Sequence, residues 1–288
     1  LNGEEKRVEY YRLYTAAQES VIGLLTKRTQ RVQRDMVLAA RKRVREIAAG
    51  AKGAPVWIRR GVPATTKAVF TEAEIERLLD LSLEKWGLEL SDAIKAPLSQ
   101  MMVEAAAVLA GEIGTQALIT SVEDPFVVNF YADYPVYLAE GPQSTLAHVI
   151  KRSILEAVTA EGVGTVSSLA QAIRIQLEQI ETSLGGIMSD LDVRADRIAR
   201  TETGKAYNGA RMEEMKLNGV EYHQWLNSRD ALVRDTHMGP PGGVDGEIRP
   251  VGEKFSNGVI FPAAGGTAPA WEVVNCRCTT VAVSKPKN

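Results

Sequence analysis

Apolar residues recur at helical spacing through the first fifty residues of the chain. Their intervals of three, four and seven positions place these side chains on one face of an α-helix. The residues concerned are Val21, Leu24, Leu25, Val32 and Met36. Residues 4–49 contain no proline, and their only glycine is Gly23. The pattern predicts one long helix, or two helices in series, over residues 4–49.

The middle of the chain alternates between helical patterns and breaks. Residues 50–63, rich in glycine and proline, are expected to separate two helical units. A second helix should open with the cap-like Thr71 and the acids that follow it, because acids stabilise a first helical turn. Further helices are expected near residues 98–119, 144–161 and 167–180. The segment 124–142, with three prolines and β-prone residues at 126–131, is interpreted as an irregular crossing.

The period of the pattern changes in the last hundred residues. A helix is expected from about 190, after the break at Gly185-Gly186, to the C-cap signature Asn218-Gly219. Its inner face is small: Ala195, Ile198, Ala199, Ala206 and Ala210. Alternation over residues 220–225, a turn at Asp245-Gly246 and a final strand within 273–283 then predict short antiparallel strands.

These elements predict an α+β protein with an elongated, mainly helical N-terminal part and a small C-terminal α+β module. The predicted division is a helical region 1–120, a helical middle region 121–189 and the module 190–288. The chain begins with Leu1 rather than Met, so we expect it to be a piece of a longer polypeptide.

Composition narrows the class of protein. The 288 residues are 45% hydrophobic and 24% charged, as in globular proteins. We expect no membrane segment, because no window approaches the roughly 18 apolar residues that a span needs. The net charge of −2 means that an electrostatic partner must be met by a local patch.

Such a patch lies in residues 27–45, which hold eight basic residues and one acid. The basic residues are Lys27, Arg28, Arg31, Arg34, Arg41, Lys42, Arg43 and Arg45. This stretch could bind DNA phosphates or an acidic partner. It could equally be a solvated helix face, or it could pair with residues 72–92, which contain seven acidic and two basic residues.

The two cysteines, Cys276 and Cys278, are one residue apart, so they share a face of an extended segment. That spacing is poor for a disulfide and favours a reducing compartment. Two thiolates with His237 and a carboxylate could hold zinc. The alternative is that both cysteines are small buried core residues.

Arg234 and His237, three positions apart, stand near Asp235 and Asp245. Acid–base catalysis would also need a nucleophile or a cofactor loop, and the sequence has no such motif. We therefore interpret Arg234 and His237 as residues that hold an irregular loop through hydrogen bonds and an ion pair.

Two further residues of this region are expected to pack inward. Thr203 follows Ala199 by four positions, which puts it on the inner helix face, where it should bond a neighbouring loop. Trp225 ends a predicted strand and should anchor the core under the helix.

Residues 98–283 resemble the Mu F-like minor head proteins of phages. The resemblance is an ordered set of sparse residues after a helical run. The set is Ile198, Ala199, Arg200, Thr201, Glu202, Thr203, Ala206, Val220, Trp225, Arg234, His237, Gly246, Phe255, Pro262, Glu272, Asn275, Cys276, Arg277 and Cys278.

The resemblance implies a structural minor head protein that acts in prohead assembly at the portal vertex of a tailed phage. It implies the portal and other head proteins as partners, a place in the virion after assembly in the host cytoplasm, and in some phages fusion to the portal. Contact with packaged double-stranded DNA is a further implication. Two alternatives stay open: an ADP-ribosyltransferase-like effector enzyme, and a DNA-binding protein acting through residues 27–45.

Overall fold

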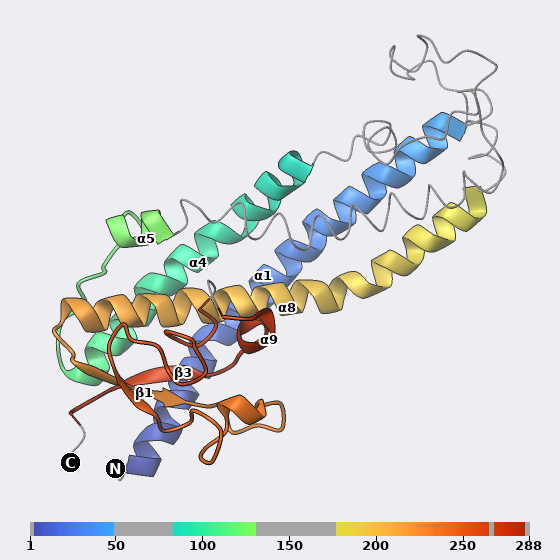
Figure 1. Ribbon diagram of the computed structural model, residues 1–288. Helices are drawn as coiled ribbons and strands as arrows, with labels where there is room; N and C mark the ends of the chain where they lie inside the picture. The colour runs from blue at the N-terminus through green and yellow to red at the C-terminus, as the bar shows by residue number, and fades with distance from the viewer. Residues whose placement is uncertain (1–2, 49–82, 131–176, 265–267, 286–288) are drawn as a thin grey trace, which may run out of the picture. The chain divides into compact units, whose positions relative to one another are not determined.

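The computed structural model describes residues 3–48, 83–130, 177–264 and 268–285. The chain forms two compact units, each assembled from separate segments of the sequence. Figure 1 labels the helices and strands. The first unit contains residues 1–27, 93–133 and 195–288, and the second contains 28–92 and 134–194. Long helices and one small antiparallel sheet make the fold α+β, as predicted. The division at residues 120 and 189 stays a prediction.

The first helix confirms the N-terminal pattern. Helix α1 runs without interruption over Gly3–Ala48, so the pattern belongs to one helix rather than two in series. Helix α4 spans Leu83–Ile113 and contains Pro97 in its interior. The prediction of a helix over 98–119 was therefore wrong at both ends. Pro97 is buried and its neighbours Leu98 and Met101 are fully buried, so packing holds the helix together despite the lost backbone donor.

At two places the sequence predicted an irregular segment or a break where the structure has helix. Residues Pro125–Phe130 form the short helix α5, not a β-prone crossing, because the Asp124 carboxylate accepts a hydrogen bond from the Phe126 amide at 2.8 Å and caps the first turn. Helix α8 runs over Leu177–Leu217, straight through Gly185-Gly186. Its end agrees with the predicted C-cap, and Gly219 has a left-handed φ of 68°.

Three strands follow α8. They are β1 (Tyr222–Leu226), β2 (Ile248–Pro250) and β3 (Thr279–Val283), joined as an antiparallel sheet in the order β2-β1-β3. In register, Trp225 of β1 lies opposite Thr280 of β3. The short helix α9 (Ala270–Val273) occupies the beginning of the predicted final strand, which was therefore placed too early.

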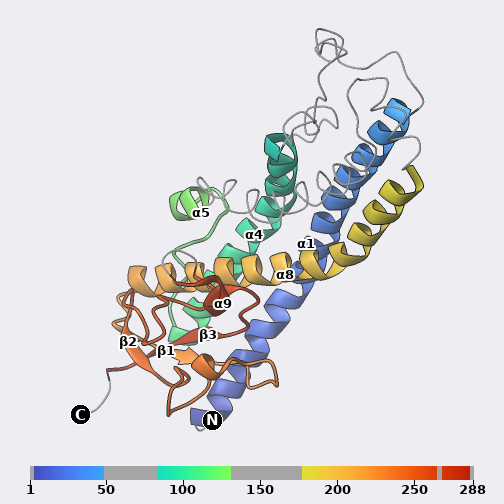
Figure 2. The same cartoon turned by 45° about the vertical axis from the view of Figure 1, so that its right-hand side comes forward.

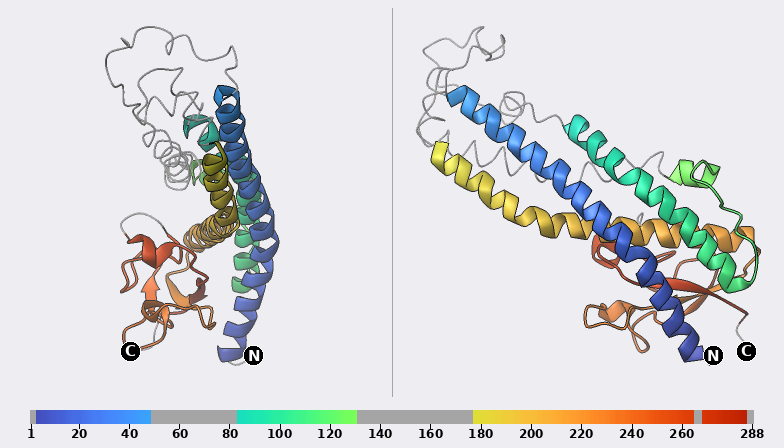
Figure 3. Two further views of the ribbon diagram at one scale, coloured as in Figure 1. Left: turned by 90° about the vertical axis from the view of Figure 1, so that its right-hand side faces the viewer. Right: turned by 180° about the vertical axis from the view of Figure 1, so that it is seen from behind.

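Helix α8 and the sheet enclose the core of the first unit. Figure 2 shows the three strands beneath the 195–217 part of α8, and in Figures 1 to 3 the start of α1 and the end of α4 run beside them. The predicted small face is buried at Ala195, Ala199, Ala206 and Ala210. It admits the loop before β3 closely, because a Cβ added at Gly204 would meet the Cys276 carbonyl oxygen at 3.4 Å.

One helix qualifies the expectation about membranes. Residues Leu88–Ile113 of α4 are long and apolar enough to cross a membrane by length and composition, and half of that window is buried inside the fold. A buried core helix meets the same criteria. The predicted break at 50–63, the helix start at 71 and the helix at 144–161 lie outside the described residues.

Candidate metal centre

His237 lies on the long connection between β1 and β2, at the end of the short 3-10 helix η1 (Asp235–His237). Its backbone is fixed on both sides: the Asn227 side-chain amide donates to the His237 carbonyl at 3.2 Å, and the His237 amide donates to the Arg234 carbonyl at 2.8 Å. The Trp225 ring stands against the imidazole at a centroid distance of 5.0 Å. The histidine is therefore positioned by backbone bonds and by aromatic packing together.

Cys276 and Cys278 lie on the link between α9 and β3. The link leaves α9 at Asn275, which adopts a left-handed φ of 59°, a conformation that asparagine tolerates better than most residues. Two hydrogen bonds reach the Cys278 carbonyl, from Tyr14 of α1 at 3.1 Å and from Asn208 of α8 at 3.2 Å. These bonds hold the backbone at Cys278 against α1 and α8, and so position the cysteines at the core.

The two thiols and the imidazole meet in the core. His237 Nδ1 lies 3.7 Å from Cys276 Sγ and 3.5 Å from Cys278 Sγ, and the three atoms all lie within 4.8 Å of one another. All three residues are at most 3% exposed. The structure thus brings together the two cysteines and the one histidine for which the sequence predicts a zinc site.

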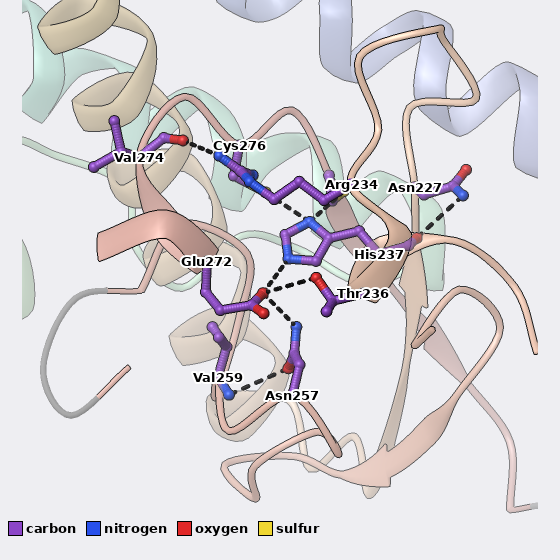
Figure 4. A network of polar contacts seen from close by, with 10 residues as sticks. Asn227, Arg234, Thr236, His237, Asn257, Val259, Glu272, Val274 and Cys276 are labelled. Carbon is purple, nitrogen blue, oxygen red and sulfur yellow. Dashed lines mark hydrogen bonds and ion pairs between the residues drawn. The ribbon is translucent and has the colours of Figure 1, made fainter. Parts of the chain in front are cut away.

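Glu272 holds the other side of the imidazole. Its Oε2 atom lies 2.7 Å from His237 Nε2, and the side chains of Thr236 and Asn257 each donate to the same oxygen at 3.4 Å (Figure 4). A carboxylate here stabilises a proton on Nε2, which leaves Nδ1 as the ring atom that faces the sulfurs. The predicted carboxylate is thus present, but it contacts the histidine rather than joining the three-atom cluster.

The charges of this cluster are coupled. Burial lowers the pKa of His237, but the hydrogen bond and charge of Cys276, together with those of Glu272, raise it above the usual value. The hydrogen bond with Cys278 lowers the pKa of Cys276 well below the usual value, against the effect of burial. The same hydrogen bond, together with burial, raises the pKa of Cys278 well above it. The pKa values of the two thiols are therefore shifted in opposite directions, with Cys276 the more acidic of the two.

The contacts from Cys276 to His237 and from His237 to Glu272 also have the order of a catalytic triad, in which a nucleophile contacts a base and a carboxylate orients that base. Such a triad must admit a substrate to the sulfur. Here Cys276 and Glu272 are each 2% exposed. The arrangement described is closed to a substrate, and binding of a small ion is the chemistry that it fits better.

Other predicted residues surround this cluster. The Arg234 guanidinium donates to the Val274 carbonyl, so Arg234 joins the histidine loop to the cysteine link (Figure 4). Gly246, with a left-handed φ of 85°, forms the predicted turn before β2. Phe255 packs edge-on against Trp225 at 5.1 Å, and both side chains are fully or almost fully buried.

The four consecutive residues of α8 singled out from the sequence, at positions 200–203, differ in their contacts. Thr201, not Thr203, bonds the neighbouring loop: its hydroxyl accepts from the Asn275 amide at 2.8 Å and donates to the Arg197 carbonyl at 2.7 Å. Thr203 is buried and its hydroxyl has no hydrogen-bond partner among the described residues. Arg200 pairs with Asp196 at 3.4 Å. Burial raises the pKa of Glu202 to about 7, against the effect of Lys205.

The basic residues at 27–45 are not near this cluster in the sequence, and none of their side chains is buried. Arg31 lies 3.9 Å from Asp35 within the same helix. Most of the acidic stretch 72–92 lies outside the described residues, so its pairing with the basic stretch stays a prediction.

Sequence reasoning missed a row of buried polar residues on α8. Asn208, Arg211 and Glu214 are at most 1% exposed, although each is strongly polar. Arg211 donates to Glu112 of α4 at 2.8 and 2.6 Å, and Glu214 accepts from the Leu118 and Ile119 amides at 2.8 and 3.0 Å. Their spacing of three beside the alanine face is the signal that could have identified them.

The comparison with family models matches residues 149–281 to the family described as Phage Mu protein F like protein. This range includes η1, α9, both cysteines and most of β3. It begins later than the resemblance over 98–283. Neither the curated proteins nor the solved structures give a match to the chain.

Proposed function

We propose that this chain, whose residues 149–281 match the family described as Phage Mu protein F like protein, is a structural minor head protein that acts at the portal vertex. The family match supports a role in phage head morphogenesis and a place in the virion. Portal contact, assembly in the host cytoplasm and the absence of catalytic turnover are the finer parts of the proposal.

The observation that supports the structural role is that residues shared with the family form hydrogen bonds within the fold. Four of the predicted residues bond other parts of the chain and join segments that are 35 to 74 residues apart in sequence: Arg234, His237, Glu272 and Thr201. Such long-range bonds stabilise the shape of the module, which is what a structural part of an assembly needs. No step of a reaction is needed to explain their arrangement.

Copy number in purified proheads tests this proposal. Quantitative mass spectrometry should find few copies per head, and these should be lost from proheads assembled without the portal. A copy number close to that of the major capsid protein, or full retention without the portal, would contradict a place at the portal vertex. NAD hydrolysis that disappears on substitution of Arg234 or His237 would contradict the structural role.

A DNA contact through residues 27–45 is the second candidate. The supporting observation is that eight basic side chains on one helix are partly or fully exposed. Each phosphate neutralised changes the slope of log affinity against log salt by about −0.9. We expect the DNA affinity of the full chain to fall steeply with salt. In the triple variant R28A/R31A/R34A the slope should become shallower by about two to three times 0.9. Binding that is insensitive to salt would exclude this candidate.

A further inference from the structure

We propose that His237, Cys276 and Cys278 bind one zinc ion, and that Glu272 orients the histidine toward it. The three ligand atoms already lie within 4.8 Å of one another, and all three side chains are buried. This inference does not depend on the role in the phage head.

The distances agree with a tetrahedral ion. With Zn–S of about 2.3 Å and Zn–N of about 2.0–2.1 Å, tetrahedral angles separate sulfur from nitrogen by about 3.6 Å. The observed separations from His237 Nδ1 are 3.7 Å to Cys276 Sγ and 3.5 Å to Cys278 Sγ. A hydrogen bond joins one ring nitrogen to one sulfur, whereas a shared ion places both sulfurs at the same distance. The near equality of the two distances therefore favours the ion.

The surroundings have the features of a metal-binding histidine. A ligating imidazole commonly donates its second N–H to a carboxylate, which fixes the tautomer and raises the basicity of the ligating nitrogen. Glu272 Oε2 at 2.7 Å from His237 Nε2 occupies that place. The Glu272 oxygen is in turn held by Thr236 and Asn257, each at 3.4 Å. The carboxylate is therefore itself positioned.

The donor set selects the kind of metal. Two thiolates and one imidazole suit zinc and other thiophilic ions, and they do not suit magnesium or calcium, which take oxygen ligands. The described residues give three ligands, and a tetrahedral ion takes a fourth. The ion would crosslink the histidine loop to the link before β3, segments 39 and 41 residues apart in the chain.

Metal analysis of the untagged full chain, prepared with zinc and without chelator, tests the proposal. We expect about one zinc per chain. The variants C276S, C278S and H237Q should each lose most of it. The matched control is His223→Gln: His223 is also fully buried, but it stacks on Phe255 at 4.8 Å and lies outside the cluster. This variant should keep its zinc.

Glu272→Gln separates metal binding from folding if the ligand variants do not fold. It keeps the size of the side chain, and the loss of such a carboxylate weakens metal binding by about 10–100-fold. Competition with a chromogenic chelator measures that change. Cobalt added to the metal-free wild-type protein should give the visible bands of a tetrahedral ion with thiolate charge transfer. A wild-type chain that contains no zinc and takes up no cobalt overturns the proposal and leaves two packed thiols.

Discussion

The basic stretch at residues 27–45 and the loop-rich region at residues 227–278 hold their polar side chains in opposite ways. On the basic stretch the charged side chains lie on the surface of one regular helix, and the Arg31–Asp35 pair joins neighbouring turns at 3.9 Å. In the loop-rich region the partners are distant in sequence: His237 with Glu272 is a buried pair, and Asn275 with Thr201 is a partly buried one. A dense run of charge therefore marks a surface, whereas the sparse polar residues hold the fold together.

The largest expected effect concerns Arg211 of α8, whose buried ion pair contrasts with the partly or fully exposed arginines of the basic stretch. Arg211 is paired with Glu112 at 2.6 Å, with side-chain exposures of 2% and 7%. Arg211→Met leaves a buried carboxylate without its partner, so we expect the free energy of unfolding to fall by about 3–5 kcal/mol. Urea titration followed by circular dichroism measures it. The double variant R211M/E112M should recover a large share of the loss. An equal loss in the single and double variants would show that the cost does not come from the unpaired Glu112 carboxylate.

Two tryptophans, one buried and one exposed, test the effect of burial on stability. Trp225 is fully buried beside His237 and Phe255, so Trp225→Ala should cost about 3–5 kcal/mol of unfolding free energy. Trp271 is 60% exposed on α9, and Trp271→Ala should change it by no more than about 0.5 kcal/mol. The two variants are compared by the same urea titration. Similar losses in both would mean that the core is not centred on Trp225.

The two regions also differ in what the sequence can predict. Helix α1 was predicted almost to the residue because its apolar face repeats with the period of the helix itself. Gly185-Gly186 was predicted to be a break because glycine disfavours helix locally, and Pro97 lies just before the predicted helix start at 98. In α4 and α8 the helix continues through them, since tertiary packing decides over local preference.

The candidate site was only partly predictable for the same reason. Two cysteines at i and i+2 share a face whatever the fold, so their pairing could be anticipated. That Glu272 contacts the far side of His237 depends on the path of two loops, which no local pattern determines. Thr203 was preferred over Thr201 because it shares the face of Ala199. The loop bond, however, comes from Thr201, at the edge of that face.

Acid should destabilise the first unit through His223 of β1. Burial lowers the pKa of His223 to about 4 from 6.5. Between these values the unfolded chain binds a proton that the folded chain does not, so stability falls as the pH decreases from 6.5 to 4. The full effect is about 3 kcal/mol at 1.36 kcal/mol per pKa unit. Urea titrations at pH 7 and 4.5 should show a smaller pH dependence in His223→Gln. The same slope in both proteins would contradict this assignment.

A single hydroxyl should have a smaller effect. Thr201→Val removes the acceptor for the Asn275 amide at 2.8 Å, and we expect a loss of about 1 kcal/mol in unfolding free energy. Thr201→Ser keeps the hydroxyl and should keep most of that energy. Hydrogen exchange of the Asn275 amide is the specific measurement, because it should speed up in Thr201→Val and stay near the wild-type rate in Thr201→Ser. Unchanged exchange in both would exclude this bond as a tie between α8 and the cysteine link.

The smallest expected effect belongs to the basic stretch. Arg31 is 85% exposed and lies 3.9 Å from Asp35, which is 54% exposed. In water such a pair gains little, because solvent screens the attraction and ordering two long side chains costs entropy. Arg31→Ala should therefore change the free energy of unfolding by no more than about 0.5 kcal/mol in the same urea titration. A loss near that of Arg211→Met would show that Arg31 bonds inside the fold, and the distinction between an outward-facing helix and an inward-facing loop region would fail at its simplest point.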